Sequence, residues 1–333
     1  MTQSKSTADA AKNDSTGAIT RLKALFAGND VFLILIAFVV LAAIASPSFL
    51  TAANLSNLLT QSALLGILSV GQFLVVVIGG FDLSVAAVMA LSSLVFAKTI
   101  GYGFAPAAML AIAAGAGCGI FNGLVVTWGR VQPLIATLAM MGIARGLALT
   151  ISERSVLVSA PLIADLRDMG GFLSVPTVIW FIIVAIAAVL LASTRQALHV
   201  FAIGGNETTS RLAGVAVEKV KLGVFATSGL LSGIAGVVLV IRSNSGVPLG
   251  GSGWELDTIA AIAIGGTNLF GGEGKLLRAM AGVLIYQLIA NVMNLMAVDP
   301  YYQNIVRAAV IICAVGLSIL RLRSASRRAI LGR

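Results

Sequence analysis

Long apolar runs dominate this sequence. The stretch from Val31 to Ala45 contains no polar residue, and similar runs follow one another to about residue 320, separated by short polar or Gly/Pro-rich stretches. Only 11% of the residues are charged, whereas soluble domains contain about a quarter. Mean hydropathy is +1.01 over the whole chain. A single anchor would confine the apolar residues to one stretch, so the chain is expected to cross a membrane many times.

These runs predict helices, because segments of about ten residues with alternating polarity, typical of membrane barrels, do not occur. The 36 glycines favour helices that pack closely in a bilayer. We therefore expect an all-α polytopic membrane protein with about ten transmembrane helices. The expected spans lie near residues 31–46, 57–78, 84–100, 105–127, 133–151, 174–193, 221–241, 256–268, 276–297 and 303–320.

Basic residues predict the orientation. Both termini are expected in the cytoplasm, because this choice gathers most Lys and Arg on the inner side, as the positive-inside rule requires. Residues 1–30 would then form a disordered cytoplasmic tail, 31–320 the transmembrane domain and 321–333 a basic cytoplasmic tail. The net charge of +9 suits contact with anionic membrane lipid and requires no nucleic acid. The inner set is Lys5, Lys12, Arg21, Lys23, Arg130, Arg195, Arg211, Lys219, Lys221, Lys275, Arg278, Arg321, Arg323, Arg327, Arg328 and Arg333, against Lys98, Arg154, Arg167 and Arg242 outside.

The longest expected outer connection, residues 152–173, carries charges of both signs. Glu153, Arg154, Asp165 and Arg167 are candidates for docking an external partner through salt bridges. On charge alone, a solvated loop explains them equally well.

Residues 194–220 form a cytoplasmic segment that is too polar to span a membrane. Gly204–Gly205 is expected to make a turn, and Asn206 to cap a following helix. Glu207 would lie in the first turn, where the helix dipole favours an acid, and it can pair with Arg211 one turn later.

Gly214 is expected to end this helix. The predicted helix has about seven residues and a length of about 10 Å. Because so short a helix is marginal alone, it should require a docking surface.

Four strings in chain order resemble the ribose-type permease family of ABC importers, over residues 30–320. They are GGFDLSV at Gly79–Val85, GRVQPLIATLAMMGIARG at Gly129–Gly146, GGNETTSRLAGVAVEKVK at Gly204–Lys221 and ELDTIAAIAIGGTNLFGGEG at Glu255–Gly274. The resemblance implies the ABC importer permease fold in a bacterial inner membrane. It also implies three partners, which are a second permease copy, an ABC ATP-binding subunit and a periplasmic sugar-binding protein.

In that family the third string couples the permease to the ATP-hydrolysing subunit. The resemblance therefore implies that Gly205, Asn206, Glu207, Arg211 and Gly214 belong to this contact.

The chain itself is expected to be non-catalytic. Gly274–Lys275 is similar to the end of a phosphate-binding loop, but Leu276 replaces the required Ser or Thr. His199 is the single histidine, and the sequence shows no catalytic or metal-ligand constellation. No cofactor is expected in this chain, and ATP and Mg would be bound by the partner subunit.

Polar residues within or at the ends of the expected spans are candidates for a sugar pathway, because unsatisfied polar groups in lipid are costly. Hydrogen bonding between helices is the main alternative for each. A cation such as Arg145 should pair with a carbonyl or an acid at that depth. The candidates are Gln61, Gln72, Asn122, Gln132, Arg145, Asn291 and Asn294.

The sequence thus predicts the permease subunit of an ATP-driven ABC importer, with a monosaccharide, first a ribose-like pentose, as the substrate. A secondary, ion-coupled transporter of a small polar solute is the alternative. That class usually places acids in the bilayer core. Here Asp82, Glu255 and Asp257 lie at the ends of expected segments, which favours the importer.

Overall fold

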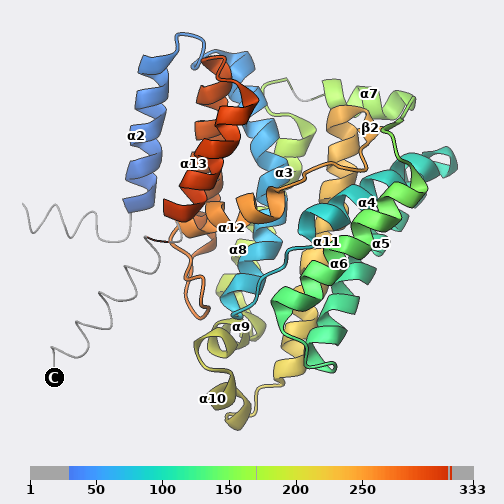
Figure 1. Ribbon diagram of the computed structural model, residues 1–333, viewed down its shortest axis with the longest axis vertical. Coiled ribbons are helices and arrows are strands. Elements are labelled where there is room, and N and C mark those ends of the chain that lie inside the picture. The colour runs from blue at the N-terminus through green and yellow to red at the C-terminus, as the bar shows by residue number, and fades with distance from the viewer. Residues whose placement is uncertain (1–29, 170, 314–315, 317–333) are drawn as a thin grey trace, which may run out of the picture.

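The computed structural model describes residues 30–169, 171–313 and 316, and this part of the chain is nearly all helical (Figure 1). Residues 1–29 of the expected N-terminal tail at 1–30, the expected tail at 321–333 and the end of the last expected span lie outside the described residues, and Asp30 begins α2. Within the described part, seven helices are long and apolar enough to cross a membrane. They are α3 (Ala52–Val77), α4 (Val85–Thr99, continued by the 3-10 turn η1, Ile100–Tyr102), α5 (Phe104–Thr127), α6 (Pro133–Ile151), α8 (Val175–Ser193), α11 (Val217–Ser243) and α13 (Leu276–Leu295).

Shorter apolar helices accompany these seven. They are α2 (Asp30–Ala45), α12 (Trp254–Ile264) and a helical stretch over residues 300–313. The 11 residues of α12 rise only about 16 Å, roughly half of the ~30 Å hydrocarbon core. The expected span at 256–268 is therefore too short to cross on its own. The total of about ten spans stays a prediction.

Small elements mark the two ends of the helix bundle (Figure 1). The lower end carries α9 (Arg195–Gly205) and α10 (Glu207–Leu212). The upper end carries α7 (Pro161–Asp168) and a two-stranded antiparallel sheet of β1 (Val156–Leu157) and β2 (Ser245–Gly246). The sequence did not predict α7 or α9, because both lie in polar connections without a long apolar period.

Helices α3 and α11 form the centre of the bundle, and most of their side chains are buried. Helix α11 packs on α3, α4 and α5. The outward face of α8 is different, because Ile186, Val189 and Leu190 are each more than half exposed. Such a face suits contact with lipid chains.

Glycines bring α5 and α11 into backbone contact. A Cβ placed on Gly115 would lie 2.5 Å from the carbonyl oxygen of Gly229, and one on Gly119 would lie 2.3 Å from that of Phe225. Only glycine permits this approach, which is the usual reason for small residues at helix crossings in membranes.

Two helices begin inside the bundle. The chain leaves α3 at the lower end and rises to start α4 near the centre, and α12 also lies at mid-height (Figure 1). The start of α4 is buried, since Asp82, Ser84 and Val85 are each about 1% exposed. The non-helical segment 78–84 therefore lies largely within protein, where its backbone can be satisfied without lipid contact. The segment 247–253 that leads into α12 is only partly covered, and Leu249 is 57% exposed.

Candidate functional site

Capping interactions define α10 at both ends. Asn206 Oδ1 accepts a hydrogen bond of 2.8 Å from the backbone N–H of Thr209. At the other end Gly214 has a φ of 84°, and its N–H donates to the carbonyl of Arg211 at 3.0 Å. The N–H of Val215 reaches the carbonyl of Ser210 at 3.0 Å, which completes a Schellman motif. The predicted cap and stop are confirmed, and the helix has six residues.

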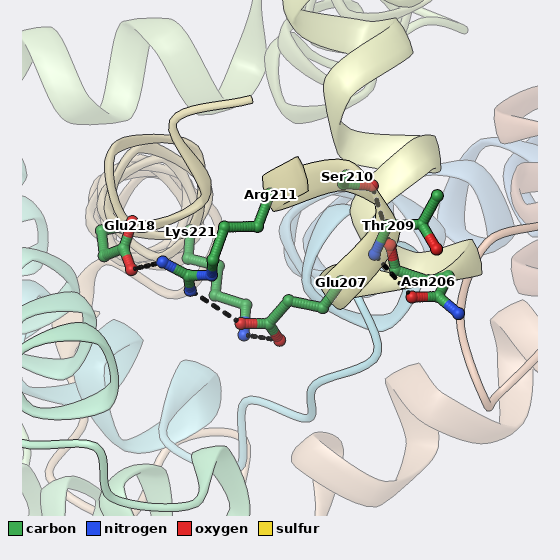
Figure 2. Close-up of polar contacts among 7 residues, drawn as sticks. All are labelled: Asn206, Glu207, Thr209, Ser210, Arg211, Glu218 and Lys221. Atoms are coloured by element: carbon green, nitrogen blue, oxygen red, sulfur yellow. Dashed lines mark hydrogen bonds and ion pairs between the residues drawn. The ribbon is translucent and has the colours of Figure 1, made fainter. Parts of the chain in front are cut away.

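Ion pairs tie α10 to the start of α11 (Figure 2). The expected pair of Arg211 and Glu207 forms at 3.4 Å. Arg211 also bonds Glu218, and Lys221 Nζ lies 2.6 Å from Glu207 Oε2. The hydrogen bond and charge attraction to Glu218 raise the pKa of Arg211. These pairs connect α10 to the first turns of the central helix α11.

The outer surface of α10 is open to a partner. Leu212 is 86% exposed, although it is apolar and stands at the end of a helix. The residues of the expected coupling contact are also exposed: Gly205, Asn206, Glu207, Arg211 and Gly214. A capped helix with an exposed leucine has the form of a docking element.

The structure corrects the expected turn at Gly204–Gly205. Both residues belong to the last turn of α9, which begins at the cap Thr194, whose Oγ1 accepts from Ala197 N at 3.3 Å. The sequence signal that could have predicted α9 is Thr194, a residue type that is favoured at the N-cap. Gly204 serves close packing instead of a turn, whereas a Cβ on Gly205 would meet nothing within 4 Å.

Three Gly-Gly pairs meet beneath α3, and we call this contact the glycine junction: Gly79–Gly80, Gly204–Gly205 and Gly271–Gly272. A Cβ on Gly204 would lie 1.7 Å from the carbonyl oxygen of Val77, which accepts a 2.9 Å hydrogen bond from the N–H of Gly272. A Cβ on Gly271 would lie 3.0 Å from Gly79 Cα.

The glycine junction joins the coupling segment to the two interior connections. Helix α9 contributes one pair, the connection 78–84 that leads to α4 contributes another, and the connection 265–275 after α12 contributes the third. The backbones touch without intervening side chains. Helix α9 is therefore in direct backbone contact with the segment that leads to α4 and with the segment that follows α12.

Asp82 anchors the start of α4. Its Oδ1 accepts from the N–H of Ser84 at 3.0 Å and from Ser84 Oγ at 2.6 Å, and Ser84 stands at the N-cap position of α4. Its Oδ2 accepts from Ser228 Oγ of α11 at 2.8 Å. Asn122 of α5 donates to Ser84 Oγ at 3.0 Å. The sequence placed Asp82 at a segment end, and the structure shows that this end is buried.

Arg145 of α6 binds the chain that leads into α12. Its Nη1 donates to the carbonyl of Pro248 at 2.8 Å, so the expected pairing with a carbonyl is confirmed. Farther along, Asp257 of α12 accepts a hydrogen bond from Tyr286 of α13. These contacts fix the interior position of α12.

The other pathway candidates lie on α3 (Gln61 and Gln72), on α13 (Asn291 and Asn294) and just before α6 (Gln132), and no side-chain hydrogen bond among the described residues joins any two of them. Asn291 exchanges two hydrogen bonds with Asn54, at 2.8 and 3.1 Å. These bonds join α13 to α3, as the alternative of helix-to-helix bonding requires. Gln72 is fully buried, and neither of its amide atoms has a partner among the described residues.

The remaining candidates for the sugar pathway are Gln61, Gln132 and Asn294. The backbone carbonyl of Gln61 accepts from Gln287 at 3.0 Å, and Asn294 accepts from Gln303 at 2.9 Å. Gln132 is exposed and precedes α6. A pathway role for these residues stays a prediction.

The candidates for docking an external partner gather at the upper end, opposite α10 (Figure 1). Glu153 and Arg154 precede β1, and Asp165 and Arg167 lie on α7. All four are exposed.

Comparison with known proteins now defines the class. Residues 54–315 match the family described as "Branched-chain amino acid transport system / permease component". The chain belongs to this family of transport-system permeases. With its seven spanning helices it is a multi-pass membrane protein.

Individual relatives are more specific. The chain is 42% identical over 292 residues to the ribose import permease protein of Escherichia coli strain K12, which covers 84% of this chain and 91% of that protein. Identity to the ribose import permease protein of Bacillus subtilis is 39%, over 85% and 90%. The L-arabinose ABC transporter permease protein of Azospirillum brasilense is 36% identical, over 86% and 84%. No solved structure matches the chain significantly.

Proposed function

We propose that this chain is the membrane-spanning subunit of an ATP-driven importer in a bacterial inner membrane, and that it carries a monosaccharide. A ribose-like pentose is the first candidate, since the relatives at 42% and 39% identity are ribose import permeases. The observation that carries the proposal is α10, a short capped helix with an exposed Leu212 that is linked by ion pairs to a central helix.

The proposed orientation places the lower end and both termini in the cytoplasm, with about ten spans in total. Support comes from charge, because Arg195, Arg211, Lys219 and Lys221 all belong to the lower end and cytoplasmic connections are rich in such residues. The upper end with α7 then faces the periplasm, where a sugar-binding protein would dock.

In this proposal the complex contains a second permease copy and ABC subunits that bind ATP and Mg. Helix α10 inserts into a cleft of the ATP-binding subunit. When that subunit moves, Glu207 and Arg211 pull on α11 through Glu218 and Lys221, and α9 pushes on the connections that meet it at the glycine junction. The interior helices α4 and α12 shift, and the pathway opens alternately to either side.

Ion-coupled transport is the competing function, and the buried acids provide its test. Both carboxylate oxygens of Asp82 accept hydrogen bonds, from Ser84 and Ser228, so they already serve helix packing. This supports a structural role for Asp82.

The test uses the whole complex with the combined variant Glu207→Ala and Arg211→Ala. These changes remove both groups that link α10 to α11, so we expect loss of most ribose uptake into proteoliposomes and less ATP-binding subunit retained on purification. The control Arg154→Ala removes an exposed cation at the opposite end and should leave subunit retention unchanged.

Uptake is measured with internal ATP and, separately, with imposed sodium or proton gradients. Dependence on ATP supports the importer. Uptake driven by a gradient without ATP, or full assembly and uptake in the double variant, would refute the proposed role of α10.

A further inference from the structure

A groove of about 880 Å³ opens on the side of the bundle between α3, α8, α9 and α11. Apolar side chains line most of its length, among them Ile186 and Leu190 of α8 and Leu231 and Ile234 of α11. Ile186 and Leu190 are 55% and 52% exposed, so this wall is open to the surroundings of the protein. In a membrane those surroundings are lipid chains.

The polar lining side chains gather at the lower end of the groove. Thr194, Gln196, His199 and Lys219 line it there. Thr227 lies farther along, but its hydroxyl is used by a 2.8 Å hydrogen bond to the carbonyl of Gly223. The groove thus has an apolar body and a polar mouth.

The mouth carries a cation and no acid. Lys219 is exposed and has no ion pair within the described residues. No Asp or Glu lines the groove, and the adjacent Glu218 is bound by Arg211. The charge at the mouth is therefore available to an anion.

The length of the groove fits an amphiphile. Lys219 and Ile234 are 15 residues apart on α11, about 22 Å along the helix. One leaflet of the hydrocarbon core is about 15 Å thick, so the groove reaches from the headgroup level to the bilayer midplane. Basic pockets between spans on the cytoplasmic side are typical sites for anionic headgroups.

We propose that this groove binds an anionic phospholipid of the cytoplasmic leaflet, with one acyl chain between α8 and α11 and the phosphate at Lys219. The leaflet assignment rests on the proposed orientation, whereas binding itself does not. Gly214 and Ala216, in the connection from α10 to α11, also line the groove. A bound lipid thus touches the coupling segment and steadies α9 against α8 and α11.

The first test is native mass spectrometry of the purified full-length permease with phosphatidylglycerol or phosphatidylcholine. The wild type should prefer phosphatidylglycerol about fivefold, the effect of one lysine near the headgroup, and Lys219→Gln should lose this preference. The control Arg195→Gln removes an exposed cation of α9 that does not line the groove and should keep it.

A second pair of variants tests the apolar body. Ile186→Trp fills the groove and should reduce retention of both lipids, whereas Val189→Trp, on the same helix but outside the groove lining, should not. Thermal unfolding confirms that each variant is folded.

Three results would overturn the proposal: no preference for phosphatidylglycerol in the wild type, equal losses in Arg195→Gln and Lys219→Gln, or equal effects of the two tryptophans. A disulfide between two copies through Leu190→Cys, with Cys118 and Cys313 replaced, would also overturn it, because the groove would then belong to the contact with a second permease. Because binding is measured without ATP-binding subunit or sugar, it can fail while the proposed transport function stands.

Discussion

At the residue scale, the absence of a Cβ atom on Gly204 allows the coupling segment to touch the transmembrane core. Gly204 lies against the carbonyl of Val77 with no space for a methyl group, but nothing lies within 4 Å of a Cβ on its neighbour Gly205. Two adjacent glycines in the same helical turn therefore have different reasons to be glycine. The first serves packing inside the permease, and the second belongs to the surface expected to meet the ATP-binding subunit.

This difference predicts a sharp contrast between Gly204→Ala and Gly205→Ala. Gly204→Ala should destabilise the permease by about 1–3 kcal/mol, because its Cβ would overlap backbone that cannot yield as a side chain does. Gly205→Ala should leave the unfolding temperature of the isolated permease nearly unchanged. Thermal unfolding in detergent measures both, and equal unfolding temperatures would contradict the glycine junction.

At the scale of elements, the crossing of α5 and α11 depends on glycines from both helices. Gly115 and Gly119 of α5 meet Gly229 and Phe225 of α11 at backbone distance. Glycines four residues apart predict one packing face on a helix, but the spacing does not identify the helix that packs against that face. The structure identifies that partner as another helix of the same chain.

A matched pair of substitutions on α5 tests this crossing. Gly115→Ala would place its Cβ 2.5 Å from the carbonyl oxygen of Gly229, whereas a Cβ on Gly117 meets nothing within 4 Å. We expect a loss of about 1–3 kcal/mol for Gly115→Ala and a clearly smaller change for Gly117→Ala. Denaturation in mixed micelles compares the two, and equal destabilisation would mean that the helices separate or repack there.

At the scale of the whole molecule, the two ends differ in chemistry. The lower end carries exposed cations and the helices α9 and α10, of which α10 is the proposed docking helix, and the upper end carries α7 and a small sheet (Figure 1). An importer needs this division, because sugar arrives on one side and ATP is hydrolysed on the other.

Cysteine labelling tests the proposed orientation. With Cys118 and Cys313 replaced by alanine, Leu157→Cys in β1 and Leu212→Cys at the end of α10 report on the upper and lower ends, and these leucines are 80% and 86% exposed. An impermeant maleimide applied to spheroplasts should label only Leu157→Cys. Leu212→Cys should react after permeabilisation, and the reverse pattern would invert the topology.

The sequence alone determined most of what depends on local chemistry. Long apolar runs require a membrane environment, so seven spanning helices appear close to their expected positions. Capping preferences are also local, and Asn206 and Gly214 therefore delimit α10 as predicted.

Tertiary structure decided what depends on contacts between distant segments. Gly204–Gly205 looks like a turn in sequence, but contact with Val77 and Gly272 makes Gly204 part of a packed helix end. Asp82 looks like a residue at a membrane surface, yet the chain rises into the bundle before it and buries it beside Ser228. The periodicity of one segment carries no information about the position of another segment. The burial of Asp82 and the contacts of Gly204 could therefore be found only in the assembled structure.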